Sequence, residues 1–211
     1  MTIGSPLSRI KQLFLSACDN QGASRNVMSF EPVPIFLAPM AGVTDLAYRL
    51  LAKECGADYT VTEFTAASGL TRRNTNSWLK VETDPREKPF IPQIFGGDIS
   101  EMAKTVEMLE DRSDVIDINF GCPAPKVCRN DAGAALLRDP DKVVNMVRRC
   151  LDSTDVPISV KMRLGTGSGP NTALEISKRL ADEGVLRICV HGRTLRQRYS
   201  CLLYTSPSPR D

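Results

Sequence analysis

The sequence predicts an α/β fold built from parallel βαβ units. Two observations predict it: short apolar runs of strand length alternate with amphipathic segments, and polar residues gather where the runs end. The runs are rich in β-branched or aromatic residues, which favour strands over short buried helices. The six runs are 35–40, 59–64, 90–95, 115–120, 158–163 and 187–192.

The segment after the first run has the signals of a helix. Thr44 is expected to cap a helix over 45–55, because its hydroxyl can accept a hydrogen bond from an N–H of the first turn. Leu46, Leu50 and Leu51 then form its apolar face.

Three later segments also have helix signals. Ser100 is expected to cap the second helix. Asp139 followed by Pro140 predicts the start of a third helix over 141–151, since proline suits the first helical position. Asn171 is expected to open a fourth.

Two architectures have this alternation of strands and helices: an open doubly wound sheet and a (β/α)8 TIM barrel. An eight-fold barrel usually needs about 250 residues. The chain has 211 residues, so a barrel requires that it be incomplete.

Both ends of the sequence differ from its middle. Residues 1–30 are polar and irregular, and are expected to be an N-terminal extension or a start assigned upstream of Met28. Residues 201–211 read CLLYTSPSPRD, and their codons can be written to resemble a transposon adapter of sequencing libraries. We therefore expect read-through there, and a partial TIM barrel over 31–200 with about six of the eight βα units.

Composition excludes several classes of protein. With 42% apolar and 25% charged residues, the chain has the composition of an ordinary globular protein, and no apolar run is long enough to span a membrane. The net charge of +2 does not by itself indicate nucleic acid. Seven cysteines without paired spacing indicate reduced thiols in the cytoplasm, and one histidine without a CxxC pair argues against a zinc or other metal site.

Polar residues lie at or near the ends of five runs, where βα loops form the active sites of such folds. Because parallel strands end at the same edge, these side chains are expected to converge on one bound molecule. They are Glu63, Gln93, Asn119, Lys161 and His191.

A cysteine follows the fourth run on a tight turn. Gly121 and Pro123 flank Cys122 and direct it toward the expected active-site face. A thiol in this position can donate a proton or act as a nucleophile, and Lys126 nearby could tune it.

The chain resembles the tRNA-dihydrouridine synthase family from about Pro34 to Ser200. The runs that carry the resemblance occur in this order: LAPMAGVTD, PFIPQIFG, DINFGCPAPKV, AGAALL, VKMRLG and VHGRT. The resemblance implies an FMN-binding TIM barrel that uses NADPH to reduce the C5=C6 bond of uridines in tRNA. It also implies a cytoplasmic, monomeric protein with no membrane or metal partner. In the family, the last two strands grip the FMN phosphate and a C-terminal helical domain contacts tRNA; neither is expected within this sequence.

The resemblance also implies roles for individual residues. Reduced flavin delivers a hydride from N5 to uracil C6, and the Cys122 thiol protonates C5 as the general acid. Lys161 stabilises the anionic reduced flavin ring. The target base leaves its stack in the RNA to reach the face of that ring. The other cofactor-binding residues implied are Pro39, Met40, Ala41, Gln93 and His191; the substrate-binding residues are Asn119, Lys126, Arg129, Arg163 and Arg193.

Three alternatives remain open from the sequence. The first is a flavin TIM-barrel dehydrogenase that acts on a free pyrimidine, such as dihydroorotate. The second is a non-catalytic RNA-binding relative with the same fold. The third is that the 211-residue polypeptide is itself inactive, because six strands leave two unpaired sheet edges.

Overall fold

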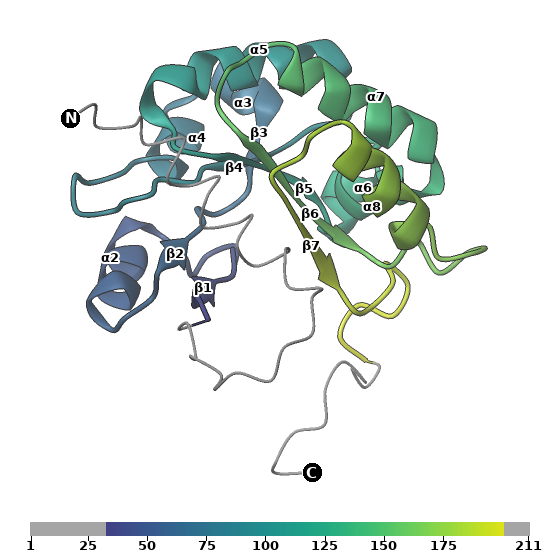
Figure 1. The fold of residues 1–211 in the computed structure, drawn as a ribbon, viewed down its shortest axis with the longest axis horizontal. Coiled ribbons are helices and arrows are strands. Elements are labelled where there is room, and N and C mark those ends of the chain that lie inside the picture. The colour runs from purple at the N-terminus through teal and green to yellow at the C-terminus, as the bar shows by residue number, and fades with distance from the viewer. Residues whose placement is uncertain (1–32, 201–211) are drawn as a thin grey trace, which may run out of the picture. The chain divides into compact units, whose positions relative to one another are not determined.

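The computed structural model describes residues 33–200 (Figure 1). The expected N-terminal extension, 1–30, and the expected read-through, 201–211, lie outside these residues. The strands are β1 (Phe36–Leu37), β2 (Tyr59–Thr60), β3 (Thr65–Ala66), β4 (Gln93–Phe95), β5 (Ile116–Phe120), β6 (Ile158–Arg163) and β7 (Arg187–His191). The α-helices are α2 (Leu46–Glu54), α3 (Ala67–Thr71), α4 (Thr75–Lys80), α5 (Ile99–Leu109), α6 (Pro125–Cys128), α7 (Pro140–Leu151) and α8 (Ala173–Asp182), with 3-10 helices η1 (Glu110–Arg112) and η2 (Gly133–Arg138).

Strand order separates the two architectures. β1 pairs with β2, and β3 to β7 form a five-stranded sheet in chain order, with every pair parallel. A doubly wound sheet reverses its order at a switch point and carries helices on both faces. Figure 1 instead shows α5, α7 and α8 in a row on one face of the sheet. The fold is therefore α/β with a parallel sheet, as expected of a partial (β/α)8 barrel.

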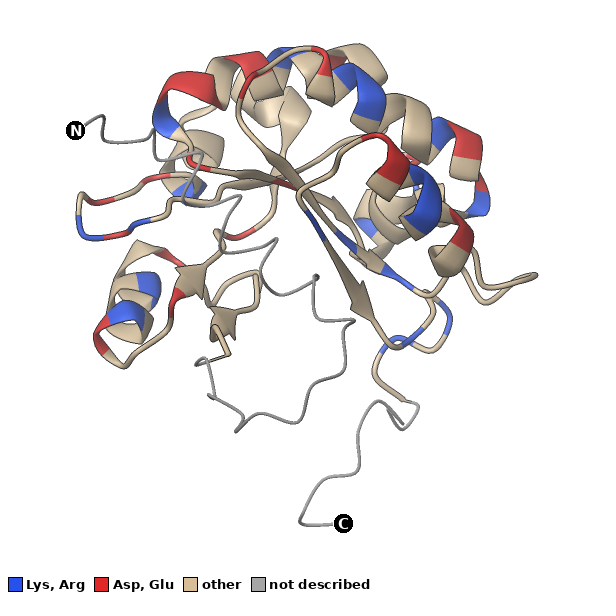
Figure 2. Cartoon of the chain, viewed as in Figure 1, with Lys and Arg blue, Asp and Glu red and all other residues tan. Residues whose placement is uncertain are grey.

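The outward face of the sheet packs against the helices. Ile94, Ile118 and Val160 occupy one register position on neighbouring strands and are fully buried. They join Val106 of α5 and Val147 of α7 in the main hydrophobic cluster. Burying each such side chain contributes about 1.5–3 kcal/mol, so this layer fixes which face of the sheet turns inward. Basic and acidic residues are interspersed on the outer helix surfaces (Figure 2).

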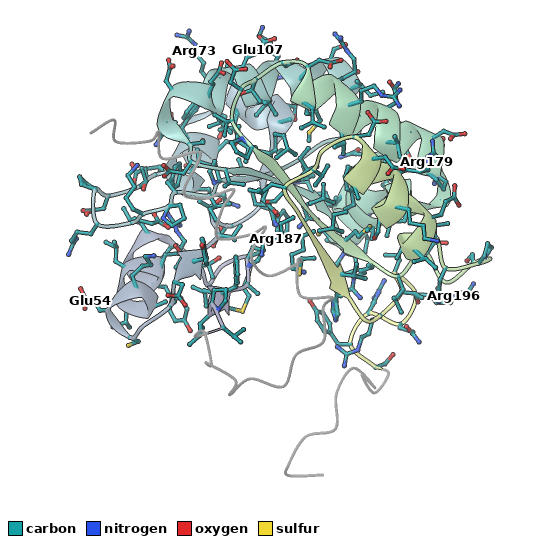
Figure 3. All side chains as sticks on the ribbon, viewed as in Figure 1. Glu54, Arg73, Glu107, Arg179, Arg187 and Arg196 are labelled. Atoms are coloured by element: carbon teal, nitrogen blue, oxygen red, sulfur yellow. The ribbon has the colours of Figure 1, made fainter. Side chains whose placement is uncertain are left out.

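The inward face is polar at the adjacent register position. Gln93, Asp117, Ser159 and Arg187 lie side by side on β4 to β7. Figure 3 shows Arg187 among the strands, and its guanidinium carbon lies 4.3 Å from the centre of the Phe36 ring. The inner face of the sheet thus carries a charged and amide layer where many barrels carry branched apolar residues.

The second expected strand, 59–64, is wrong in its extent. The structure divides this region into β2 and β3, with no strand assigned over 61–64. The backbone N–H of Gln93 donates to the Thr62 hydroxyl at 2.9 Å rather than to a carbonyl, which interrupts the ladder. The Thr62 N–H still donates to Ile91 O at 3.1 Å, so the segment between β2 and β3 stays hydrogen-bonded to the segment before β4.

Two expected helix caps are wrong, and in both cases an aspartate takes the role. Asp45, not Thr44, accepts from the Tyr48 N–H at 2.8 Å, while the Thr44 hydroxyl accepts from the Met40 N–H at 3.0 Å. Asp98 caps α5 in place of Ser100. In each case the aspartate lies three residues before the residue whose N–H donates to it. Neither Thr44 nor Ser100 has this spacing to the same N–H.

Three other helix expectations have mixed outcomes. The Asp139 cap is confirmed, because its carboxylate accepts from the Lys142 N–H at 3.0 Å. The fourth helix begins at Ala173 without a side-chain cap, so the Asn171 start is wrong. Leu51 was expected on an apolar packing face but is 54% exposed.

Within residues 33–200, no helix combines the length and apolarity needed to cross a bilayer.

A buried ion pair ties α2 to the segment before β4. Arg49 Nε lies 2.6 Å from Glu87 Oε1, and both side chains are almost fully buried. The Thr60 hydroxyl donates to the same oxygen at 2.8 Å, and Arg49 also donates to the carbonyls of Thr44 and Glu82. Each charge therefore has several partners, which a buried ion pair requires.

Replacing Arg49 by methionine should lower the free energy of unfolding by about 3–5 kcal/mol, because it leaves Glu87 buried without its counter-ion. Urea denaturation would measure the change. Glu183→Ala is the control, since it breaks the exposed Arg148–Glu183 pair and should change stability little. Equal losses in the two variants would contradict the role assigned to the buried pair.

Candidate functional site

A cavity of about 570 Å³ opens at the carboxyl ends of β5, β6 and β7. Its walls also include the segment that follows β1 and the turn that carries Cys122. The volume lies within the range of small-molecule and cofactor sites. Of the residues expected at the site, those that line it are Pro39, Met40, Ala41, Asn119, Cys122, Lys161, Arg163 and His191.

Hydrogen bonds to a neighbouring asparagine hold the Cys122 turn. The backbone N–H groups of Gly121 and Cys122 both donate to Asn119 Oδ1, at 2.9 and 2.8 Å. On the other side, the Cys122 carbonyl accepts from the Ala134 N–H at 3.1 Å. Gly133 has φ +61°, and an added Cβ there would lie 2.9 Å from the Cys122 carbonyl oxygen. Glycine is therefore required at 133 for the two segments to approach this closely.

The protonation state of Cys122 follows from its burial. Only 6% of the residue is exposed, and burial raises the pKa of its thiol above the ordinary value. A backbone hydrogen bond with Ala124 and the positive charge of Arg163 oppose this shift without cancelling it. The thiol is protonated at neutral pH, so Cys122 is suited to donate a proton rather than to attack as a thiolate.

Lys161 and His191 bring two different polar groups to the cavity wall. The Lys161 ammonium is half-buried and has no ion pair or hydrogen bond to any of residues 33–200. The pKa of His191 is lowered to about 4, first by burial and then by the charges of Arg163, Lys161 and Arg193. The cavity wall therefore offers an ammonium without a partner among residues 33–200 and a neutral imidazole, which has both a donor and an acceptor nitrogen.

Arg163 lines the cavity but is 1% exposed and bonded to backbone. Its Nε donates to Gly121 O at 2.8 Å, and its Nη1 donates to the carbonyls of Thr194 and Arg198, each at 3.1 Å. These bonds join the Cys122 turn to the segment after β7. They occupy donors that the sequence assigned to phosphate or base edges.

Five residues expected at the site do not line the cavity: Glu63, Gln93, Lys126, Arg129 and Arg193. Gln93 is fully buried, with both ends of its side chain hydrogen-bonded to protein groups. Lys126 and Arg129 lie exposed on and after α6, beside the Cys122 turn, and Arg129 donates to Pro125 O at 3.3 Å. Arg193 is half-buried, with its guanidinium 5.9 Å from the Tyr199 ring centre.

Glu63 supports the site without lining it. Its Oε1 accepts from the Gly42 N–H at 2.6 Å, and its Oε2 lies 3.5 Å from Lys80 Nζ. The first contact holds the loop that carries Met40 and Ala41 to the cavity.

Sequence reasoning missed two groups of residues. Arg198 and Tyr199 line the cavity, but they follow the last strand without a periodic pattern that would mark them. Asp117 and Ser159 lie two residues before Asn119 and Lys161 on the same strands. Since side chains alternate between the two faces of a strand, this spacing was a usable signal for further inward-facing polar groups.

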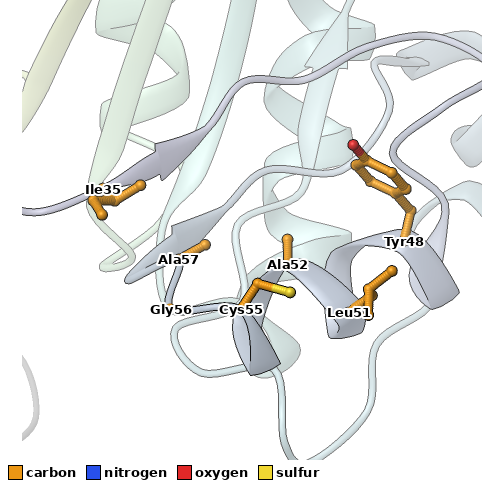
Figure 4. A pocket seen from close by; sticks show the side chains of 7 residues that line it. All are labelled: Ile35, Tyr48, Leu51, Ala52, Cys55, Gly56 and Ala57. Atoms are coloured by element: carbon orange, nitrogen blue, oxygen red, sulfur yellow. The ribbon is translucent and has the colours of Figure 1, made fainter.

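A second hollow of about 320 Å³ contains none of the expected site residues (Figure 4). Apolar side chains such as Ile35 and Leu51 line it, together with Tyr48. The chemically equipped cavity is the one at Cys122.

Comparison with known proteins agrees with the site. Residues 36–205 match the family model described as dihydrouridine synthase (Dus). The chain belongs to the dihydrouridine synthase family. Enzymes of the Dus family generally depend on FMN. The resemblance inferred from the sequence motifs is thus confirmed.

Several curated Dus proteins are similar to this chain. A probable tRNA-dihydrouridine synthase of Rhizobium leguminosarum is 37% identical over 166 residues, which is 78% of this chain and 52% of the relative. tRNA-dihydrouridine synthase B of Pseudomonas aeruginosa is 35% identical, covering 80% and 51%. A probable tRNA-dihydrouridine synthase of Treponema pallidum is 33% identical, covering 79% and 51%. The chain thus spans about half the length of the curated relatives it matches.

The lowered His191 pKa predicts a pH-dependent contribution to stability. Between the ordinary pKa of 6.5 and the folded value of about 4, the unfolded state binds more protons at this residue. The free energy of unfolding should therefore fall as pH decreases from 6.5 toward 4. His191→Gln should lack this part of the decrease, as measured by thermal unfolding at a series of pH values. A wild-type-to-variant difference that is the same at pH 4.5 and pH 8 would contradict the prediction.

Proposed function

We propose that the complete gene product is an oxidoreductase that reduces the C5=C6 bond of uridines in tRNA to give dihydrouridine, with FMN as cofactor and NADPH as reductant. The observation that carries the proposal is the protonated Cys122 thiol on the wall of a cavity that also holds an unpaired ammonium. Membership of the Dus family and the names of the similar proteins support it.

The residues of the cavity fit a flavin. Pro39, Met40 and Ala41 offer an apolar wall against which a planar ring can lie. The Lys161 ammonium has no partner among residues 33–200 and suits an electron-rich ring edge. The neutral His191 can hydrogen-bond a carbonyl, a ring nitrogen or a hydroxyl. Bound FMN, once reduced by NADPH, supplies the hydride that uracil C6 receives.

The chain's own residues handle the proton and the charge. Hydride addition at C6 leaves negative charge on C5 and the C4 carbonyl, and the Cys122 Sγ–H donates its proton to C5. Asn119 holds the turn that presents this thiol, through its bonds to the Gly121 and Cys122 N–H groups. The Lys161 ammonium stabilises negative charge in the cavity.

Basic residues around the cavity are proposed to contact the nucleic acid. Lys126 and Arg129 are exposed beside the Cys122 turn, where phosphate contacts would orient tRNA while the target base leaves its stack. Arg193 lies after β7 and extends this positive surface. Arg163 is buried and supports the same segment through its bond to the Thr194 carbonyl. Gln93 is proposed to support the flavin side of the site indirectly, by accepting a hydrogen bond from the Asn119 side chain.

The proposal extends to the protein's organisation. We propose that residues 31–200 form the FMN-binding catalytic part. We propose a monomer that works in the cytoplasm.

The direct test is to express the complete gene product and measure its visible flavin spectrum. Its conversion of uridine to dihydrouridine is then measured by mass spectrometry on tRNA from cells that lack the modification. Bound flavin with dihydrouridine formation supports the proposal. A colourless protein that does not bind added FMN would overturn it, and reduction of free uracil or oxidation of dihydroorotate without tRNA activity would assign a different substrate.

Cys122→Ala should leave the flavin content unchanged and lower dihydrouridine formation about 10²- to 10⁴-fold, the usual contribution of a general acid. The measurement is dihydrouridine formed per bound flavin. Cys55→Ala is the matched control, because Cys55 is an exposed thiol outside the cavity. Normal turnover by the Cys122 variant would remove this residue from the proton-transfer step.

Lys161→Ala should weaken FMN retention, because it removes a half-buried cation from the cavity wall. Titration of the flavin-free protein with FMN would measure the dissociation constant. Lys104→Ala, on the exposed face of α5, is the control for loss of a positive charge. An unchanged FMN affinity in the Lys161 variant would exclude the proposed contact.

A further inference from the structure

A chain of side-chain hydrogen bonds crosses the inner face of the sheet and ends at the Cys122 turn. Asp117 Oδ2 accepts from Gln93 Nε2 at 2.6 Å, and Gln93 Oε1 accepts from Asn119 Nδ2 at 2.8 Å. Asn119 Oδ1 in turn accepts from the N–H groups of Gly121 and Cys122. Two strand residues, Gln93 and Asn119, thus connect the buried Asp117 carboxylate to the backbone of the cysteine.

The direction of this chain is set at its carboxylate end. Asp117 Oδ2 accepts from Gln93 Nε2, so Gln93 turns its NH₂ group toward Asp117 and its oxygen toward Asn119. Asn119 must then offer its own NH₂ group to Gln93. This orientation leaves Asn119 Oδ1 facing the two N–H groups of the turn, which need an acceptor.

The other oxygen of Asp117 has partners that lie outside the path to Asn119. It is fully buried, its Oδ1 accepts from the Ser159 hydroxyl, and Arg187 Nη2 lies 3.6 Å from the same oxygen. Neither Asp117 nor Gln93 lines the cavity, so neither touches a ligand there. Both act at a distance from the reacting atoms.

We propose that Asp117 is a positioning residue for Cys122: through Gln93 it fixes the amide orientation of Asn119, and through Asn119 it fixes the turn that presents the thiol. The inference concerns the turn itself. Its consequence for catalysis rests on the function proposed above.

Four variants of the complete gene product test this inference. Asp117→Ala removes the carboxylate, whereas Asp117→Asn keeps an oxygen that can accept from Gln93. Gln93→Met breaks the chain in the middle and leaves the contact between Asp117 and Arg187. Ser159→Ala is the matched control, because it removes a bond to the same carboxylate outside the path to Asn119.

The main measurement is amide hydrogen exchange at Gly121 and Cys122, resolved by fragmentation mass spectrometry. Asp117→Ala and Gln93→Met should each raise exchange there roughly 5- to 10-fold, as expected for the loss of one supporting hydrogen bond. Asp117→Asn and Ser159→Ala should leave it near the wild-type rate. Because the two disruptive changes act on one chain, their double variant should not add.

Dihydrouridine formation provides a second measurement. Asp117→Ala should lower kcat at saturating tRNA while flavin content and the rate of flavin reduction by NADPH stay unchanged, since Cys122 acts only on uracil. Asp117→Asn should restore most of the turnover.

Each alternative outcome decides against part of the argument. Unchanged exchange at Gly121 and Cys122 in Gln93→Met would overturn the proposal, even if Asp117→Ala fails to fold. Equal effects of Asp117→Asn and Asp117→Ala would show that the charge opposite Arg187 matters and not the bond chain. If the wild-type protein forms no dihydrouridine, the proposed function fails, but the exchange pattern still decides whether Asp117 positions the turn.

Discussion

The site depends on one constraint, the parallel register that aligns β4, β5, β6 and β7. This register places Gln93, Asp117, Ser159 and Arg187 at one level on the inner face and leaves their apolar neighbours to pack against the helices. A slip of one residue would exchange the two faces and bury the polar layer under α5 and α7. The helix-facing hydrophobic cluster therefore holds the polar interior in place, although it makes no contact with a ligand.

Much of the fold could be predicted because its determinants are local. The run 158–163 matches β6 at both ends, and Asp139 caps α7 as expected. The failures arise where tertiary contacts decide. Thr44 is a good N-cap by residue type, but its hydroxyl is engaged by Met40, so the next residue takes the role. The run 59–64 is divided because the Thr62 hydroxyl accepts a bond that a strand carbonyl would otherwise receive.

The candidate site shows the same division. Strand-end logic identified Asn119, Lys161 and His191, which the structure brings to one cavity. It could not separate residues that face the cavity from residues that support it. Arg163 has the side chain of a phosphate-binding residue, yet its donors go to Gly121, Thr194 and Arg198. Whether an arginine binds a phosphate or bonds to the backbone depends on its distance to carbonyls far away in the sequence. No local pattern encodes that distance.

The burial of Cys122 has a consequence for chemical labelling. Electrophilic probes such as iodoacetamide react with thiolates, and the raised pKa keeps this sulfur protonated at neutral pH. A probe added to the protein meets the exposed Cys55 more readily than the buried thiol of the cavity. Selective covalent capture of Cys122 would therefore require recognition by the cavity, with an electrophile attached to a molecule shaped to bind between the 39–41 segment and Lys161.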